Sequence, residues 1–241
     1  MSQELSSHYD AAFYESGASD SRKSAAVVVP LVNKLLRPES VLDVGCGVGA
    51  WLAEWVSQGV TNVLGLDGEH VDQTTLQIES TDFLPVDFRG RFSLGRRFDL
   101  VESLEVAEHL EELYADEFVE SLASHADTVL FSAAIPGQGG THHVNEQWPS
   151  YWVAKFSRVG LELFDIVRPL IWADRRVGRC YRQNILIFSS NLTFDVDNAR
   201  VDVVHPEYWE ADPSLRQLIG GLPTALRSAM RNRIPAVGNR A

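Results

Sequence analysis

The sequence predicts an α/β fold, in which a mostly parallel sheet carries helices on both faces. Short β-branched runs alternate with stretches of helical periodicity along most of the chain. The run VLDVG (41–45) is followed at once by closely spaced glycines, as where a buried strand turns tightly into a helix. Parallel strands need crossover connections, and these connections place helices on both faces of the sheet.

Seven segments have strand character: 41–45, 62–67, 83–86, 98–104, 127–135, 161–169 and 180–190. Apolar residues at helical spacing predict helices at 21–36, 49–57, 105–124 and 148–160. Three domain regions follow: an N-terminal helical segment or lid (1–37), a central domain (38–190) and a C-terminal appendage with an Arg-rich end (191–241). The lid would include Tyr9, Phe13 and Tyr14, and the last helix would lie at 214–219 or 224–232.

Composition and net charge limit the partners and the cellular location that the sequence favours. Of 241 residues, 45% are hydrophobic, which is enough for a large core, and the net charge is −12. From Ser214 onward there are five arginines and no lysine or acid, so the residues before it carry −17. Bulk electrostatics therefore oppose nucleic-acid binding. Two cysteines, a polar N-terminus and the absence of a long apolar run favour a cytoplasmic protein that does not enter a membrane. The oligomeric state stays open.

A glycine loop and acidic strand ends indicate a nucleoside site. Gly45, Gly47 and Gly49 form G-x-G-x-G two residues after Asp43, which fits a loop bending around a nucleoside that bears an amino acid. Asp67 ends the second strand, where it can accept hydrogen bonds from ribose hydroxyls. Asp87 can meet an adenine amino group, with Phe88 against the ring.

Together with FDLVESLEVAEHL (98–110), these motifs resemble the class I S-adenosylmethionine-dependent methyltransferases over residues 38–188. The resemblance implies a Rossmann-like seven-stranded sheet with one reversed strand near its C-terminal end, which CYRQNILIFSS (180–190) can supply. It implies S-adenosyl-L-methionine as the cofactor. The cofactor-binding residues it implies are Asp43, Gly45, Cys46, Gly47, Gly49, Asp67, Gly68, Asp87, Phe88, Ser103 and Leu104.

Glu105, Glu108 and His109 are the candidate catalytic cluster. On the predicted helix their spacing places all three side chains on one face. They are either acids that complement a helix dipole or ligands of a divalent ion such as Mg²⁺, Mn²⁺ or Fe²⁺. The spacing E-x-x-E-H resembles the metal motif of small-RNA 3′-terminal 2′-O-methyltransferases, and a similar motif occurs in ubiquinone-pathway O-methyltransferases.

That motif takes a further histidine from downstream of the fifth strand. The segment GGTHHVNEQW (139–148) offers His142 or His143, and His143 is favoured because the Asn-Glu-Gln-Trp run beside it can anchor it. The predicted catalytic and metal-ligating set is therefore Glu105, Glu108, His109 and His143.

The leading functional hypothesis is a metal-assisted O-methyltransferase acting on a small hydroxylated molecule, such as a sugar or a secondary metabolite. A bound ion would lower the pKa of the acceptor hydroxyl, which an amine acceptor would not need. The alternatives are an RNA ribose 2′-O-methyltransferase that grips phosphates with its Arg-rich end, a metal-independent small-molecule methyltransferase and a non-enzymatic cofactor-binding protein.

Overall fold

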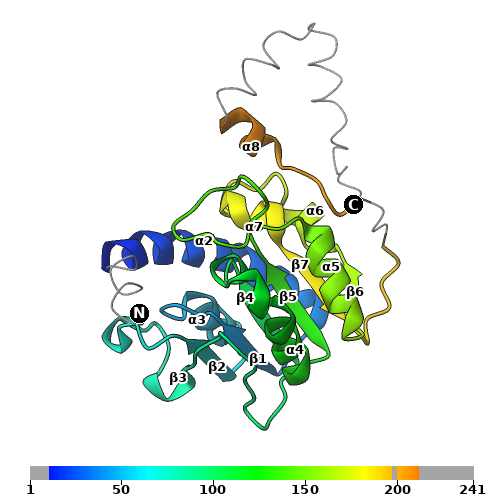
Figure 1. The fold of residues 1–241 in the computed structure, drawn as a ribbon. Helices are drawn as coiled ribbons and strands as arrows, with labels where there is room; N and C mark the ends of the chain where they lie inside the picture. The colour runs from blue at the N-terminus through cyan, green and yellow to red at the C-terminus, as the bar shows by residue number, and fades with distance from the viewer. Residues whose placement is uncertain (1–10, 197–199, 212–241) are drawn as a thin grey trace, which may run out of the picture. The chain divides into compact units, whose positions relative to one another are not determined.

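A computed structural model describes residues 11–196 and 200–211, and its main feature is a seven-stranded sheet between two layers of helices (Figure 1). This arrangement confirms the predicted fold class. The strand order is β3-β2-β1-β4-β5-β7-β6. The strands are β1 (Ser40–Val44), β2 (Asn62–Asp67), β3 (Phe83–Pro85), β4 (Leu100–Leu104), β5 (Thr128–Ser132), β6 (Glu162–Phe164) and β7 (Leu186–Ser189).

Strand β7 is the one reversed strand of the sheet. It runs antiparallel to β5, with Val129 opposite Phe188, and antiparallel to β6, with Leu163 opposite the same Phe188. The other neighbouring pairs are parallel. The reversed strand that the sequence predicted within 180–190 is therefore confirmed.

Helices cover both faces of the sheet. The α-helices between residues 11 and 196 are α2 (Ala11–Leu36), α3 (Ala50–Ser57), α4 (Ala115–His125), α5 (Pro149–Arg158), α6 (Arg168–Ile171) and α7 (Arg179–Asn184). Helices α2 and α3 pack on one face with residues of α6 and α7, and α4 and α5 pack on the other. The two cores share the sheet as their common wall.

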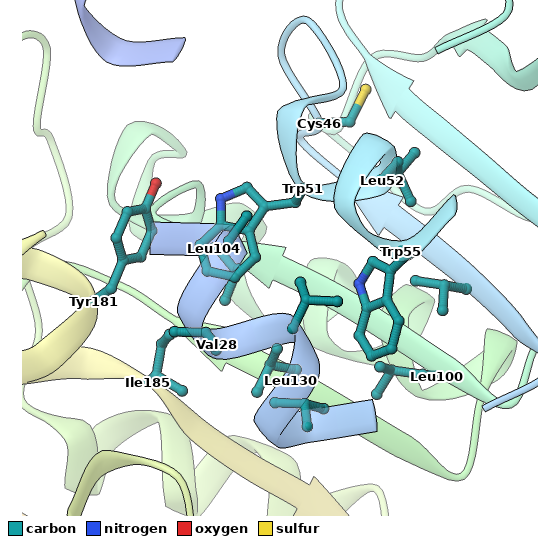
Figure 2. Packing of buried hydrophobic residues seen from close by; sticks show 14 of the residues in the cluster. Val28, Cys46, Trp51, Leu52, Trp55, Leu100, Leu104, Leu130, Tyr181 and Ile185 are labelled. Carbon is teal, nitrogen blue, oxygen red and sulfur yellow. The ribbon is translucent and has the colours of Figure 1, made fainter. Parts of the chain in front are cut away.

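The strands supply alternate residues to the two cores. On β5, Leu130 faces the α2 and α3 side, whereas Val129 and Phe131 face α4 and α5. This period of two is the geometry of a strand buried on both faces. Figure 2 shows the first core, where Trp51 and Trp55 of α3 lie with Val28, Leu100, Leu104 and Leu130.

Three predicted elements are corrected. The helix expected over 105–124 begins only at Ala115, and two short 3-10 turns, Ala107–His109 and Glu112–Tyr114, precede it. The strand expected over 180–190 begins as helix α7 and extends only from Leu186 to Ser189. The strand expected over 161–169 stops at Phe164, and helix α6 follows.

The described part of the N-terminal segment is a single helix, because α2 runs from Ala11 to Leu36 with Pro30 inside it, and its role as a lid stays a prediction. Tyr9 and the last predicted helix, at 214–219 or 224–232, lie outside the described residues. No described helix is both long and apolar enough to span a lipid bilayer.

The first compact unit of the chain ends at Val203. Arg168 Nη1 donates a hydrogen bond to the carbonyl of Val201, and Gln183 Nε2 donates one to that of Val203, which ties residues beyond β7 to this unit. The second unit begins at Val204, and helix α8 (Pro206–Ala211) is its described element. The domain division predicted at 37/38 and 190/191 stays a prediction.

Phe156 of α5 tests this packing. Its ring is fully buried, stacks on Phe188 at 4.0 Å between centroids and meets Phe131 edge-on. We expect Phe156→Ala to lower the free energy of unfolding by about 3–5 kcal/mol, because it removes buried contacts and leaves a cavity. Chemical denaturation measures this loss. Val56→Ala, at an exposed position of α3, is the control and should change stability by no more than about 0.5 kcal/mol. Equal effects of the two substitutions would contradict the packing.

Candidate active site

The glycine loop lies at the carboxyl end of β1, at the edge where parallel sheets of this kind bind ligands. The amides of Gly45 and Cys46 donate to the carbonyl of Leu66, at 2.7 and 3.0 Å. Gly45 has φ 87°, and a Cβ there would lie 2.3 Å from Cγ2 of Val106. Glycine is therefore required both by the backbone conformation and by Val106, which packs against the loop.

Asp67 joins the end of β2 to this loop. Its carboxylate accepts from the amide of Gly47 and from that of Gly68, each at 2.7 Å. Burial raises the pKa of Asp67, and these two hydrogen bonds oppose the rise. A carboxylate has about four acceptor sites, so Asp67 retains capacity for further donors such as ribose hydroxyls. Its role as the ribose acid stays a prediction.

Asp43 and Glu102 form a buried acidic pair beneath the loop. They are register partners on the adjacent strands β1 and β4, and both are buried. Trp55 Nε1 donates to Glu102 Oε2 at 3.0 Å. Burial raises the pKa of Glu102 to about 8. Burial, followed by the charges of Glu102 and Asp67, holds the pKa of Asp43 well above its usual range. Glu102 was missed from the sequence, although an acid in the middle of the predicted strand FDLVESL is a detectable signal.

Several predicted cofactor residues have contacts within the protein, and their contacts with the cofactor stay predictions. The Cys46 side chain packs beneath the loop, since a Cβ on Gly65 would lie 2.6 Å from its Sγ. Phe88 lies in the core against Phe92 and Phe118, and its predicted position against an adenine ring stays a prediction. Asp87 forms an ion pair with Arg89 at 2.6 Å.

The other predicted positions lie close to the loop. Gly68 makes room for the ring of His70, whose Nε2 is 3.6 Å from Asp67. Ser103 and Leu104 end β4 and are buried. Cofactor contacts of these residues and of Asp87 stay predictions.

Glu105 is not on a helix, which corrects the predicted shared face. It has φ 58°, a left-handed conformation that ends β4, and its amide donates to the carbonyl and hydroxyl oxygens of Ser132, each at 3.0 Å. Its carboxylate accepts from Gln138 Nε2 at 2.9 Å and from Asn184 Nδ2 at 3.0 Å. Gln138, which fell within a loop, was missed from the sequence, and Asn184 was expected to support core packing because it fell within a predicted strand.

Glu108 follows in the 3-10 turn Ala107–His109 and is fully buried. Neither of its carboxylate oxygens has a hydrogen-bond partner among the described residues. Its backbone carbonyl accepts from the amides of Val144 and Asn145, at 2.9 and 3.0 Å. Burial, and then the charge of Glu105, holds the pKa of Glu108 well above its usual range. A buried carboxyl group without a partner is costly unless a cation or a proton compensates it.

His109 and His143 complete a cluster with Glu108. One ligand atom from each of the three lies within 4.8 Å of the others, and the two imidazole centroids are 5.0 Å apart. Burial, and then the charge of His143, lowers the pKa of His109 to about 4, so this imidazole is neutral at pH 7. Of the two histidines that the sequence left open, His143 has its ring in the cluster, whereas His142 offers its carbonyl to His109 Nδ1 at 3.3 Å.

The solved structures of other methyltransferases share this fold. The sugar N-methyltransferase KedS8 from Streptoalloteichus aligns with a TM-score of 0.57 and 17% identity, over 73% of this chain and 90% of its own. The methyltransferase domain of bacterial CtHen1 aligns with a TM-score of 0.51 and 17% identity, over 69% of this chain and 98% of its own. The fold and the glycine loop thus define a class I S-adenosylmethionine-dependent methyltransferase.

Sequence comparison identifies the family. The family described as "Methyltransferase domain" matches residues 18–161, more than half of the chain, and the protein belongs to it. A ubiquinone biosynthesis O-methyltransferase from Methylobacterium nodulans is 34% identical over 102 residues. That match covers 40% of this chain and 41% of the relative's length. The residues at the carboxyl edge fit the donor, because Gly47 carries no side chain at the middle of the loop and Asp67 retains acceptor capacity.

Gly45→Ala tests the donor loop. We expect donor affinity to fall at least roughly tenfold, because the new Cβ must displace Val106 or the loop, and the overpacking should cost about 1–3 kcal/mol of stability. Calorimetry with S-adenosylhomocysteine measures the affinity. Gly59→Ala is the matched control, since Gly59 has a similar φ of 92° but open space around its Cβ position. The control should keep donor affinity. A similar loss of affinity in both variants would contradict the role of Gly45 in the donor loop.

Glu102→Gln tests the buried pair by pH. An acid whose pKa is raised on folding destabilises the fold once it ionises, so stability is lost as pH rises from about 4.5 through about 8. Gln keeps an acceptor for Trp55 and does not ionise. Between pH 5 and 9, the free energy of unfolding of the wild type should fall by at least about 1.4 kcal/mol more than that of the variant. Urea unfolding measures both. The exposed Glu162→Gln should follow the wild type, and parallel profiles for Glu102→Gln would contradict the assignment.

Proposed function

We propose that this methyltransferase acts on a hydroxyl group of a small molecule with the help of a divalent metal ion. One observation carries the proposal: Glu108, His109 and His143 converge at the carboxyl edge of the sheet, next to the turn whose Val106 packs on the donor loop. The 3-10 turn supplies two of these residues and the loop between β5 and α5 supplies the third.

The residues fit a divalent ion by their chemistry. They combine carboxylate oxygen with imidazole nitrogen, a set suited to Mg²⁺, Mn²⁺ or Fe²⁺. The partnerless carboxylate of Glu108 is the group that most needs a cation, and the low pKa of His109 keeps its imidazole neutral, as a ligand must be. Glu105 is the proposed fourth ligand, although it lies outside this group of three and its carboxylate is held by Gln138 and Asn184. When bound, such an ion lowers the pKa of a hydroxyl group and orients it.

The chain's own residues would position the two substrates. The glycine loop and Asp67 hold the donor, and the cluster holds the acceptor hydroxyl in line with the donor's methyl group. The carbon–sulfur bond breaks with its electron pair remaining on sulfur, and a carbon–oxygen bond forms to the acceptor. The hydroxyl proton passes to a carboxylate of the cluster, for which Glu105 and Glu108 are the candidates.

A small acceptor is supported by charge and by similarity. The chain carries −12, which opposes contact with a long polyanion. The Methylobacterium relative is an O-methyltransferase of ubiquinone biosynthesis, and the structural neighbour KedS8 is a sugar N-methyltransferase. We therefore extend the proposal to a hydroxylated ring compound or a sugar as the acceptor class.

RNA ribose 2′-O-methylation is the second candidate. The E-x-x-E-H spacing favours it, because this spacing resembles the metal motif of small-RNA 3′-terminal 2′-O-methyltransferases. The five arginines after Ser214 would contact the phosphates. Such binding would weaken steeply with salt, so a labelled RNA titrated at increasing salt separates this candidate from a small-molecule enzyme.

Glu108→Gln tests the metal. We expect Mn²⁺ affinity, measured by calorimetry on the protein without acceptor, to fall by about 100-fold or more, because the substitution replaces a charged carboxylate with a neutral amide of similar shape. Affinity for S-adenosylhomocysteine should be unchanged, and Glu162→Gln is the exposed control. Methyl transfer to a panel of catechols and sugars should cease with EDTA and return with Mn²⁺. Transfer that survives both EDTA and Glu108→Gln would establish a metal-independent enzyme instead.

A further inference from the structure

Glu146 organises the loop between β5 and α5. Its carboxylate accepts from the amide of Gly137 at 2.7 Å and from that of Gly139 at 2.8 Å. The segment contains no regular helix or strand, so these bonds, which close it on itself, determine its shape. The amides of Val144 and Asn145 fasten the same loop to the carbonyl of Glu108.

The same carboxylate meets the ring of His143. The Nδ1 atom of His143 lies 3.0 Å from Glu146 Oε1, and the two side chains are only 12% and 20% exposed. A carboxylate accepts hydrogen bonds and donates none when it is ionised, so it places the ring proton on Nδ1. The lone pair of the neutral ring is then on Nε2, and this is how outer carboxylates orient histidines that bind metals.

Gly140 lies against the ring of His143. A Cβ at this position would lie 2.2 Å from Nε2 of His143 and 2.4 Å from Cε1. The absence of a side chain at Gly140 therefore allows the ring of His143 to occupy this position beside the backbone. The shape of the loop and the orientation of the ring thus both depend on one short segment.

We propose that Glu146 is a positioning residue that sets the tautomer and orientation of His143 for binding a divalent cation. This role rests on the proposed metal-assisted function. Glu146 does not contact the ion. It holds the Nδ1 proton, fixes the peptides of Gly137 and Gly139, and so directs Nε2 of His143 toward the cluster with Glu108 and His109.

The histidine tautomers provide the first readout, which needs neither metal nor acceptor. Nitrogen-15 spectra of the metal-free protein should show His143 protonated on Nδ1 in the wild type, and this preference should be lost in Glu146→Ala. His125 is an internal standard, because its Nδ1 lies 2.6 Å from the carbonyl of Ser121 while its Nε2 accepts from the amide of Leu94. Its signals should not change, and they also report that the fold is intact. An unchanged His143 tautomer in Glu146→Ala would overturn the proposal.

Metal affinity provides the second readout. We expect Mn²⁺ to bind Glu146→Ala about 10- to 100-fold more weakly than the wild type, with affinity for S-adenosylhomocysteine retained. Glu146→Gln keeps an acceptor oxygen for Nδ1 and should lie between the two, and Glu162→Ala should match the wild type. Wild-type Mn²⁺ affinity in Glu146→Ala would overturn the positioning role. If the wild type itself bound no Mn²⁺, the metal-assisted function would fail, and the tautomer of His143 would still decide what Glu146 does.

Discussion

The turn at Glu105 is the constraint on which both halves of the site depend. Its left-handed backbone costs about 1–2 kcal/mol for a residue with a side chain, and the hydrogen bonds from its amide to Ser132 offset that cost. Directly after the turn, Val106 packs on Gly45, while Glu108 and His109 meet the loop that carries His143. One change of backbone direction therefore fixes the donor loop and the acidic cluster relative to each other.

Acidic side chains buried at one edge of the sheet give the site its electrostatic character. Asp43, Glu102, Glu105 and Glu108 all have raised pKa values, and burial is the largest cause in each case. Amides, Trp55 and backbone groups offset only part of the desolvation. An edge of the sheet with buried acids of this kind favours cationic ligands, and the sulfonium group of the donor is one. The proposed divalent ion is the second, so the two would share one field.

The sequence predicted the elements whose pattern is local. Strand β1, its glycine loop and Asp67 were placed correctly, because a buried strand that ends in glycines has few alternatives. The helix expected over 105–124 was confirmed from Ala115 onward and wrong before it, because spacing cannot reveal a left-handed residue at its first position. The expected strand over 180–190 was wrong for its first half, because residues that alternate in polarity can also form a short helix such as α7 when tertiary contacts favour it. The sequence indicated the Asn-Glu-Gln-Trp run as the anchor of His143 but did not single out Glu146, because its partners are backbone amides and one ring, which no residue pattern encodes.

The reversed strand β7 determines the order in which the molecule can be completed during synthesis. Among the described strands, β6 pairs only with β7, and β7 also covers the second edge of β5. Until residues 186–189 leave the ribosome, β5 therefore has an open edge and β6 has no partner, a state that invites pairing with other chains. Asn184, which holds the carboxylate of Glu105, is made only just before this strand. The donor loop can form early in translation, whereas the acidic cluster acquires its full support only with the last strand to be inserted.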